Sequence, residues 1–368
     1  MEKKPDYGLA ERADAQATVA PELPYRPRSP RSYNPGIGLV GCGGVSEQHL
    51  KAYSNAGFRV VALCDRTEAK ARSRQRQFFP NAVVTTEYQR VLDRRDVEVV
   101  DVTTHPHQRG SILQEALLAG KHVLSQKPLV TDLDFGMRLV DLAKRQGVHL
   151  AVNCNGRWAP HFSYIRHAVA DGLIGTVLSV HCGVRWDHNW IAGTAFDQVR
   201  HIILYDFGIH WFDILTCFVR HPALRVYASL TRSPGQKATP ALLGQALIEF
   251  DGAQATLSFD GDTRFGPSDR TVVIGDRGTL VSEGPDLMEQ RVTLFRQDSY
   301  ARPQLAGTWF PDGFHGTMGE LLCAIEEGRQ PLNDARSHLQ SLELCFAAVA
   351  SAEDHLPHVP GSIRKLPG

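Results

Sequence analysis

The sequence predicts a two-domain α/β protein, in which a parallel sheet with helices on both faces precedes an α+β domain with a mostly antiparallel, open sheet. The chain has 368 residues, the length of two domains of ordinary size. Between residues 36 and 153, short apolar runs alternate with helical stretches, as in successive βαβ units. After residue 154 the pattern changes to alternating strand-like segments bounded by helical ones.

The first domain spans residues 36–154 and begins with the apolar run GIGLV. Strands are predicted at 36–40, 58–64, 82–86, 97–104, 121–125 and 149–153. Helical stretches are predicted between them at 45–56, 67–79, 88–95, 107–120 and 132–147. Right-handed crossovers place such helices on both faces of the sheet.

The second domain spans residues 155–368 and has helical stretches near both of its ends. Helices are predicted at 161–172, 204–219, 315–328 and 335–354. Strands are predicted at 176–186, 225–231, 244–250, 253–259, 270–275, 278–282 and 291–295. Residues 1–35 are polar and rich in proline, and we interpret them as an extended arm. The arm is either a disordered tail or a segment that wraps a neighbouring subunit.

Composition excludes several classes of protein. Lys plus Arg and Asp plus Glu are both 40, which argues against a nucleic-acid binder with a strongly basic face. With 42% hydrophobic residues the chain is not wholly disordered, and no apolar run is long enough to span a membrane. The seven cysteines form no C-x-x-C pair, which gives no support to a structural zinc site. We expect a cytoplasmic protein, since the N-terminus lacks the apolar segment of a secretory signal.

A glycine-rich turn, GCGGVS over residues 41–46, joins the first strand to the first helix. It matches the G-x-G-x-x-G/A pattern of dinucleotide-binding Rossmann domains, with Ser46 in the third position, where a small residue is needed. Gly41 would allow the tight turn, and Gly43 would let the backbone approach a pyrophosphate. The N–H groups at the start of the helix would bind the phosphates.

The end of the second strand indicates which dinucleotide is bound. Asp65 follows Gly43 by 22 residues, where a carboxylate holds the ribose hydroxyls of NAD and disfavours a 2′-phosphate. Arg66 could instead pair with that phosphate. We favour NAD over NADP.

Two further segments carry candidate catalytic residues. Lys127 precedes Pro128 at the carboxyl end of a predicted parallel strand, where open α/β sheets place their ligands. Asp206, His210 and Asp213 have the spacing of one helix face, and an Asp–His pair can orient an imidazole for general base work. Taken alone, each segment has a structural alternative: a surface Lys-Pro dipeptide, and a helix-capping Asp with a core His.

Polar and aromatic residues crowd the start of the second domain, and they suit a polyhydroxylated ring. The candidate substrate contacts are Asn155, Arg157, Trp158, Trp186, His188, Asp206 and His210. The alternative is that these tryptophans are core or subunit-interface residues. The histidines and aspartates here match no compact metal motif, so we expect no metal.

Four segments, GCGGVSEQHL, ALCD, AGKHVLSQKP and DFGIHWFD, together resemble the glucose–fructose oxidoreductase / inositol dehydrogenase (Gfo/Idh/MocA) family over residues 36–355. The resemblance implies a Rossmann domain, and a second domain whose open sheet forms a homo-oligomer, a dimer, tetramer or hexamer. It also implies binding of NAD or NADP, and oxidation or reduction of a secondary alcohol on a sugar or cyclitol.

The family's catalytic residues fall on Lys127, Asp206 and His210. The resemblance implies that His210 takes the hydroxyl proton, Lys127 bonds the same oxygen, and Asp206 orients the network. Gln126 replaces the family's usual Glu, and the missing carboxylate predicts that Lys127 deprotonates more readily. The candidate cofactor contacts are Gly41, Gly43, Gly44, Val45, Asp65, Arg66, Thr104, His105, Gln126 and Lys127.

These observations predict an NAD(P)-dependent oxidoreductase that acts on a secondary ring hydroxyl of a sugar, glycoside or cyclitol. The most specific interpretation is oxidation at C3 of a glucoside, with a tightly bound, recycled cofactor as one option. Two alternatives stay open. One is a redox-assisted, NAD-dependent glycoside-cleaving enzyme, and the other is a non-catalytic dinucleotide-binding protein.

Overall fold

The computed structural model describes residues 15–368, so the first 14 residues of the predicted arm lie outside the described part. The N-terminal domain has a six-stranded, fully parallel sheet in the order β4-β3-β2-β5-β6-β7. Its strands are β2 (Gly36–Val40), β3 (Arg59–Cys64), β4 (Val83–Thr85), β5 (Val99–Val102), β6 (His122–Ser125) and β7 (Leu150–Val152). Its helices are α1 (Ser46–Ala56), α2 (Glu68–Phe78), α3 (Gln89–Leu92), α4 (Pro106–Leu118) and α5 (Leu133–Gln146).

The C-terminal sheet has nine strands in the order β1-β15-β14-β13-β12-β8-β11-β10-β9, and only its β1–β15 and β8–β11 pairs are parallel. Its strands are β1 (Gln16–Thr18), β8 (Val177–Arg185), β9 (Ala223–Thr231), β10 (Leu243–Phe250), β11 (Ala253–Asp260), β12 (Ser268–Gly275), β13 (Thr279–Gly284), β14 (Arg291–Arg296) and β15 (Ser299–Ala301). The predicted fold class is confirmed, although the short edge strands β1 and β15 were not predicted.

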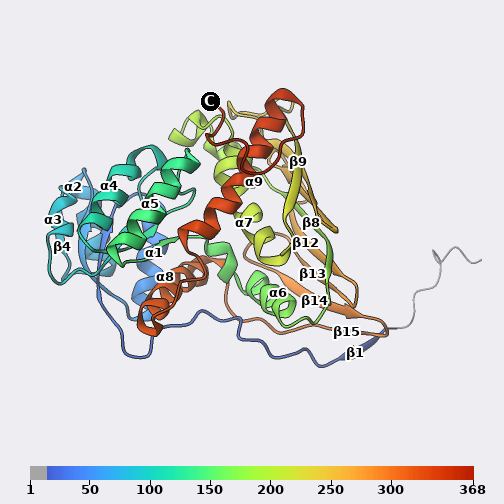
Figure 1. Cartoon of the computed structure of the whole chain (residues 1–368), viewed down its shortest axis with the longest axis horizontal. Helices are drawn as coiled ribbons and strands as arrows, with labels where there is room; N and C mark the ends of the chain where they lie inside the picture. The colour runs from blue at the N-terminus through green and yellow to red at the C-terminus, as the bar shows by residue number, and fades with distance from the viewer. Residues whose placement is uncertain (1–14) are drawn as a thin grey trace, which may run out of the picture.

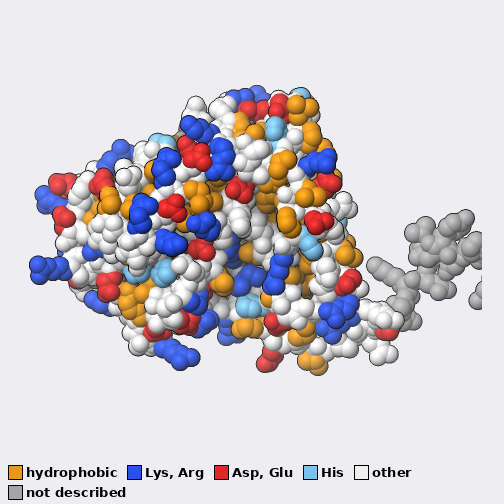
Figure 2. All heavy atoms as spheres, viewed as in Figure 1, with side chains coloured by type: hydrophobic (Ala, Val, Ile, Leu, Met, Phe, Trp, Pro, Cys, Tyr) orange, Lys and Arg blue, Asp and Glu red, His pale blue; other side chains and the backbone are white. Residues whose placement is uncertain are grey.

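The helical segments of the second half lie on the side of the large sheet that faces the N-terminal domain (Figure 1). They are η1 (Asn155–Trp158), α6 (Pro160–Ala170), η2 (Asn189–Ile191), η3 (Ala195–Gln198), η4 (Ile202–Phe207), α7 (Ile209–Phe218), α8 (Trp309–Glu327) and α9 (Ala335–Asp354). None of the described helices has the length and apolarity needed to cross a membrane. Figure 2 shows acidic and basic side chains interspersed over this face, without a dominant patch of one sign.

The predicted helix 204–219 differs from the observed backbone. A π-helical turn, η4, covers Ile202–Phe207, and the α-helix α7 starts only at Ile209. The wider turn removes the regular helical spacing between Asp206 and His210, so these two side chains do not share one α-helical face as predicted.

Helix α8 joins the two halves of the chain. Its apolar residues Phe314, Met318 and Leu321 belong to the same buried cluster as Leu50 and Tyr53 of α1. The sequence-based division assigns this helix to the second domain, yet its apolar side completes the core of the first.

Residues 15–35 of the arm pack on their own chain. Strand β1 extends the edge of the C-terminal sheet, and Pro21 accepts a hydrogen bond from Tyr164 Oη at 3.0 Å. Nearer the first domain, the backbone N–H groups of Ser32 and Tyr33 donate to the Glu326 carboxylate at the end of α8. In Figure 1 the arm passes beneath both domains. The described part of the arm therefore packs against both domains of its own chain.

Candidate active site

A cleft opens at the carboxyl ends of the parallel strands, where the strand order reverses between β2 and β5. Open α/β sheets place their ligands at this switch point. The cleft is lined by every residue predicted to contact a cofactor. It is also lined by Lys70, Gln108, Arg109, Phe196 and Asp206.

The glycine turn forms one wall of the cleft. Gly41 has φ of +105°, and a Cβ there would come within about 3 Å of Thr103 and Thr104. No protein atom lies within 4 Å of the place where a Cβ would stand on Gly43 or Gly44. A side chain at either position would therefore project into the cleft, and the bare backbone leaves that space to a ligand.

Asp65 lies at the end of β3 and is held in place by the backbone. One carboxylate oxygen accepts from the N–H of Cys42 and the other from the N–H of Thr67, both at 2.8 Å. Each oxygen keeps a lone pair, so the carboxylate can accept hydrogen bonds from ribose hydroxyls. Together with the glycine turn ahead of helix α1, this arrangement fits an NAD molecule.

Lys127 reaches from the N-terminal domain to η4. Its Nζ donates to the backbone oxygen of Asp206 at 2.8 Å and lies 3.4 Å from the Asp206 carboxylate. Both side chains are mostly buried, at 17% and 24% exposure. The structure thus brings together two of the three predicted catalytic residues.

His210 is half-buried, and its ring packs edge-to-face on Trp309 at 5.6 Å. Burial, and next the nearby Lys127 ammonium, hold the pKa of His210 well below its ordinary value of 6.5. The imidazole is therefore neutral near pH 7 and able to accept a proton. The expectation that Asp206 pairs with His210 is wrong for the described residues, because the Asp206 carboxylate faces Lys127 and makes no hydrogen bond with His210.

Gln126 does not face the Lys127 ammonium. Its Oε1 accepts from the Lys127 backbone N–H at 2.7 Å, and its Nε2 lies 3.0 Å from His49 Nε2. His49 in turn donates from Nδ1 to Asp101, which also accepts from Tyr53. The predicted electrostatic effect of Gln126 on the ammonium therefore lacks a contact. Sequence reasoning missed the buried His49–Asp101 pair, because its members lie 52 residues apart.

Arg109 on α4 is a second residue that sequence reasoning missed. It is 1% exposed and donates to the backbone oxygens of Thr104, Gln126 and Pro128. The carbonyls of Gln126 and Pro128 flank Lys127. The signal in the sequence is a charged residue that precedes the apolar helical stretch SILQEALL.

Trp186 and His188 lie behind Asp206. The indole of Trp186 stacks on Phe207 with ring centres 4.1 Å apart, and its Nε1 donates to His188 Nδ1 at 2.8 Å. Burial lowers the pKa of His188 to about 4, so this ring is neutral. Phe196 lines the cleft and contacts His105 and the exposed Trp190.

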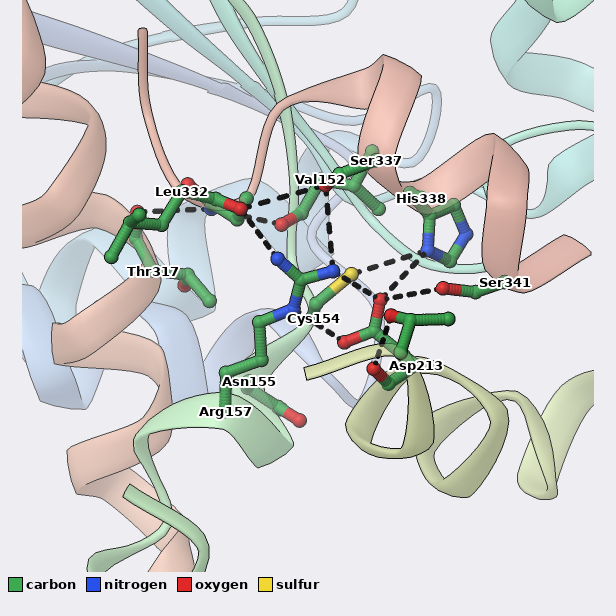
Figure 3. A network of polar contacts seen from close by, with 12 residues as sticks. Val152, Cys154, Asn155, Arg157, Asp213, Thr317, Leu332, Ser337, His338 and Ser341 are labelled. Carbon is green, nitrogen blue, oxygen red and sulfur yellow. Dashed lines mark hydrogen bonds and ion pairs between the residues drawn. The ribbon is translucent and has the colours of Figure 1, made fainter. Parts of the chain in front are cut away.

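Arg157 is a structural residue, contrary to the predicted substrate contact. It donates from Nε and Nη2 to the two carboxylate oxygens of Asp213 at 2.6 and 2.7 Å, and it also binds the backbone oxygen of Leu332 (Figure 3). Ser341 donates to the same carboxylate at 3.0 Å. The guanidinium, despite the cost of burial, holds the pKa of Asp213 well below its ordinary value. Arg157 and Asp213 therefore form a buried ion pair behind the cleft.

Two other predicted substrate contacts are also buried away from the cleft. Trp158 is 5% exposed and packs so closely on Gly316 that a Cβ there would overlap the indole. Asn155 accepts a hydrogen bond from Trp309 Nε1 at 3.1 Å. Asn155 therefore fixes the orientation of Trp309, on which His210 packs, and does not itself line the cleft.

Two sequence models of one family match the chain. Residues 36–154 match the "Oxidoreductase family, NAD-binding Rossmann fold" model, and residues 162–281 match the "GFO/IDH/MocA C-terminal domain" model. The first match confirms the predicted NAD-binding fold.

Curated relatives extend the similarity along most of the chain. A D-apiose dehydrogenase from Paraburkholderia graminis is 25% identical over 86% of this chain and 87% of its own length. An inositol 2-dehydrogenase from Rhizobium meliloti is 25% identical over 86% of this chain and 97% of its own.

Solved structures share the fold. An oxidoreductase from Agrobacterium radiobacter, crystallised with NAD+, L-tartaric acid and magnesium, superposes with a TM-score of 0.80 at 18% identity, covering 90% of this chain and 99% of that one. A levoglucosan dehydrogenase in complex with NADH and levoglucosan gives 0.76 at 20% identity, covering 89% and 100%.

Proposed function

The chain belongs to the GFO/IDH/MocA oxidoreductase family, and on that premise we propose that it is an NAD-dependent dehydrogenase for a secondary ring hydroxyl of a sugar, glycoside or cyclitol. One observation carries the proposal. The ammonium of Lys127 and the carboxylate of Asp206 meet at the glycine-lined cleft, and the neutral ring of His210 lies close enough to feel the Lys127 charge.

These residues divide the work of alcohol oxidation. Held by the glycine turn and Asp65 in the cleft, NAD+ would supply the hydride acceptor. His210 accepts the hydroxyl proton, because its imidazole is uncharged at neutral pH. Lys127 donates a hydrogen bond to the same oxygen and stabilises the negative charge that develops there. Asp206 holds the ammonium in position from the other domain. Run in reverse, the same groups return the proton and reduce a ketone.

A polyhydroxylated substrate is supported by the names of the relatives and by the aromatic side chains at the cleft. The two curated relatives are named for D-apiose and inositol, and both compounds carry several hydroxyls. In this chain, Phe196 lines the cleft beside Asp206 and contacts Trp190, which is 59% exposed. Aromatic faces of this kind pack on the C–H groups of a sugar ring. Oxidation at C3 of a glucoside is the most specific form of the proposal.

We also propose that the chain forms a homo-oligomer through the outer face of its large sheet. Leu247 and Tyr227 are paired across neighbouring strands, and each is about 40% exposed. In Figure 1 no helix covers this face. Native mass spectrometry tests the proposal, and a monomer at micromolar concentration would contradict it.

A substrate panel tests the function. Purified protein is incubated with NAD+ or NADP+ and a set of cyclitols, pentoses, hexoses and glycosides, and both NADH and sugar products are followed. We expect a ketone product that disappears in Lys127→Met and His210→Asn and persists in Lys144→Met, which removes an exposed lysine on α5. Aglycone release with catalytic NAD+ would favour the glycoside-cleaving alternative. A normal phenotype with Lys127→Met and His210→Asn would favour the non-catalytic one.

A further inference from the structure

Arg109 differs from the other arginines that line or surround the cleft because it is fully inside the protein. Its residue exposure is 1%, while Arg66 at the rim of the same cleft is exposed. A guanidinium is charged at all working pH values, and a buried charge is normally paired with a carboxylate. Among the described residues, however, no carboxylate lies within 4 Å of the Arg109 guanidinium.

The partners of Arg109 are backbone carbonyls from two loops. The loop after β5 contributes Thr104 O, and the loop after β6 contributes Gln126 O and Pro128 O. These carbonyls accept four hydrogen bonds from the guanidinium but carry no formal charge, so its positive charge remains at the site. Desolvation lowers the pKa of Arg109 to about 10, which still leaves it protonated near pH 7.

The surroundings of Arg109 leave the inner end of the cleft with a positive balance. Lys127 stands between the two carbonyls that Arg109 binds, and its ammonium adds a second positive charge. Asp206 supplies one negative charge, which contacts Lys127 and acts on Arg109 from a greater distance. Burial chiefly, and in addition the charge of the Arg109 guanidinium, lower the pKa values of His105 and His338. Both rings are therefore neutral near pH 7 and add no charge.

This charge bears directly on the proposed reaction. In the proposed oxidation of a secondary alcohol, the C–H hydrogen would leave as hydride to the nicotinamide ring of bound NAD+, the O–H proton would pass to His210, and a ketone would remain. The nicotinamide ring would thereby lose its positive charge. A fixed cation nearby therefore disfavours the oxidised ring and favours the reduced one.

We propose that Arg109 sets the redox preference of this site, as a buried cation that stabilises bound NADH over bound NAD+ while it braces the backbone on both sides of Lys127. The proposal rests on the proposed function only in requiring NAD(H) in the cleft. It assigns Arg109 a positioning and electrostatic role, without contact with the reacting atoms.

Equilibrium binding of NAD+ and NADH to the full-length protein tests the proposal. Titrations followed by tryptophan fluorescence and calorimetry give the ratio of the two Kd values. Arg109→Gln removes the charge, and we expect it to move that ratio toward NAD+ by about tenfold. Arg109→Lys keeps the charge but loses the planar fork, so its ratio should stay within about threefold of wild type while kcat falls. Arg166→Gln, on α6 away from the cleft, is the matched control and should leave the ratio unchanged.

Asp206→Asn provides a second test that leaves the hydrogen bonds of Arg109 in place. It removes the negative charge of the site, so the ratio should move toward NADH. An unchanged ratio in Arg109→Gln overturns the proposal, and so does an unchanged ratio in Asp206→Asn if Arg109→Gln does not fold. If the wild-type protein bound neither NAD+ nor NADH, the proposed function would be refuted instead. Failure of the Arg109 proposal and failure of the proposed function are thus distinguishable.

Discussion

Replacing Gln126 with Glu should make the stability of this protein depend on pH. The amide of Gln126 is 6% exposed, and its orientation is fixed because Oε1 accepts from the Lys127 N–H. Its Nε2 therefore donates to His49 Nε2. Asn153, whose Oδ1 accepts from Thr317, also directs its amide nitrogen at the same atom, at 3.3 Å. His49 Nε2 is thus an acceptor for two donors.

In Gln126→Glu, a carboxylate oxygen would face the lone pair of a fully buried imidazole nitrogen. The loss of a donor and the burial of an unpaired acceptor cost about 1–3 kcal/mol, and more when the acceptor is charged. A proton bound between the introduced carboxylate and His49 relieves the conflict. At about pH 7.5 and above, nearly all unfolded chains carry no proton on either group, so the folded variant binds close to one proton more. Its stability then falls by up to about 1.4 kcal/mol per pH unit as the pH rises.

Urea unfolding between about pH 6.5 and 8.5 measures this effect. We expect the free energy of unfolding of Gln126→Glu to decline with pH relative to wild type. The control Gln126→Leu loses the donor without adding a charge, so its deficit should be constant. The pH–rate profile should move little, because the Lys127 ammonium contacts Asp206 and not residue 126. A Gln126→Glu protein as stable as wild type at the highest pH would refute this reasoning.

Four other outcomes follow from the site. His210 has a depressed pKa, so kcat/KM should stay high as the pH falls through about 6.5 and drop only below it; a midpoint at 6.5 would contradict the assignment. Asp213→Ala leaves the buried Arg157 without its carboxylate partner and should lower the free energy of unfolding in urea by about 3–5 kcal/mol. Since the pKa of Asp213 is depressed, the stability that this carboxylate contributes in wild type is present above about pH 4 and is lost as the pH falls. A cost below about 1 kcal/mol would argue against the buried ion pair. Asp65→Ser should lower the preference for NAD+ over NADP+ at least about tenfold in kcat/KM, and an unchanged preference would place the ribose elsewhere. Trp190→Ala should raise the sugar KM severalfold with the Kd of NADH unchanged, and the reverse pattern would show that Trp190 does not contact the sugar.

The residues that line the cleft could be predicted because their signals are local. The turn over residues 41–46 and the acid Asp65 each sit at the end of a strand, and the parallel order of the strands brings those ends to one edge. Lys127 also follows a strand, β6, so its place in the cleft was accessible from the sequence.

The contacts of the residues proposed to bind substrate were predicted less well, because their partners are distant in sequence. Arg157 looks like a free cation until Asp213 pairs with it from 56 residues away. Gln126 finds its partner 77 residues earlier, at His49. The π-helical turn before α7 likewise displaces Asp206 from His210, and a spacing rule based on a regular α-helix cannot anticipate that shift.

Hydride transfer itself is the most direct test of the account. Wild-type protein is incubated with NAD+ and ring-deuterated cyclitols and sugars, then denatured, and the extracted cofactor is examined by mass spectrometry, so that a tightly held cofactor is also seen. The account predicts deuterated NADH together with a ketone product, and no deuterium in the cofactor of Lys127→Met or His210→Asn. Bound dinucleotide that never acquires deuterium from any sugar or cyclitol would contradict it.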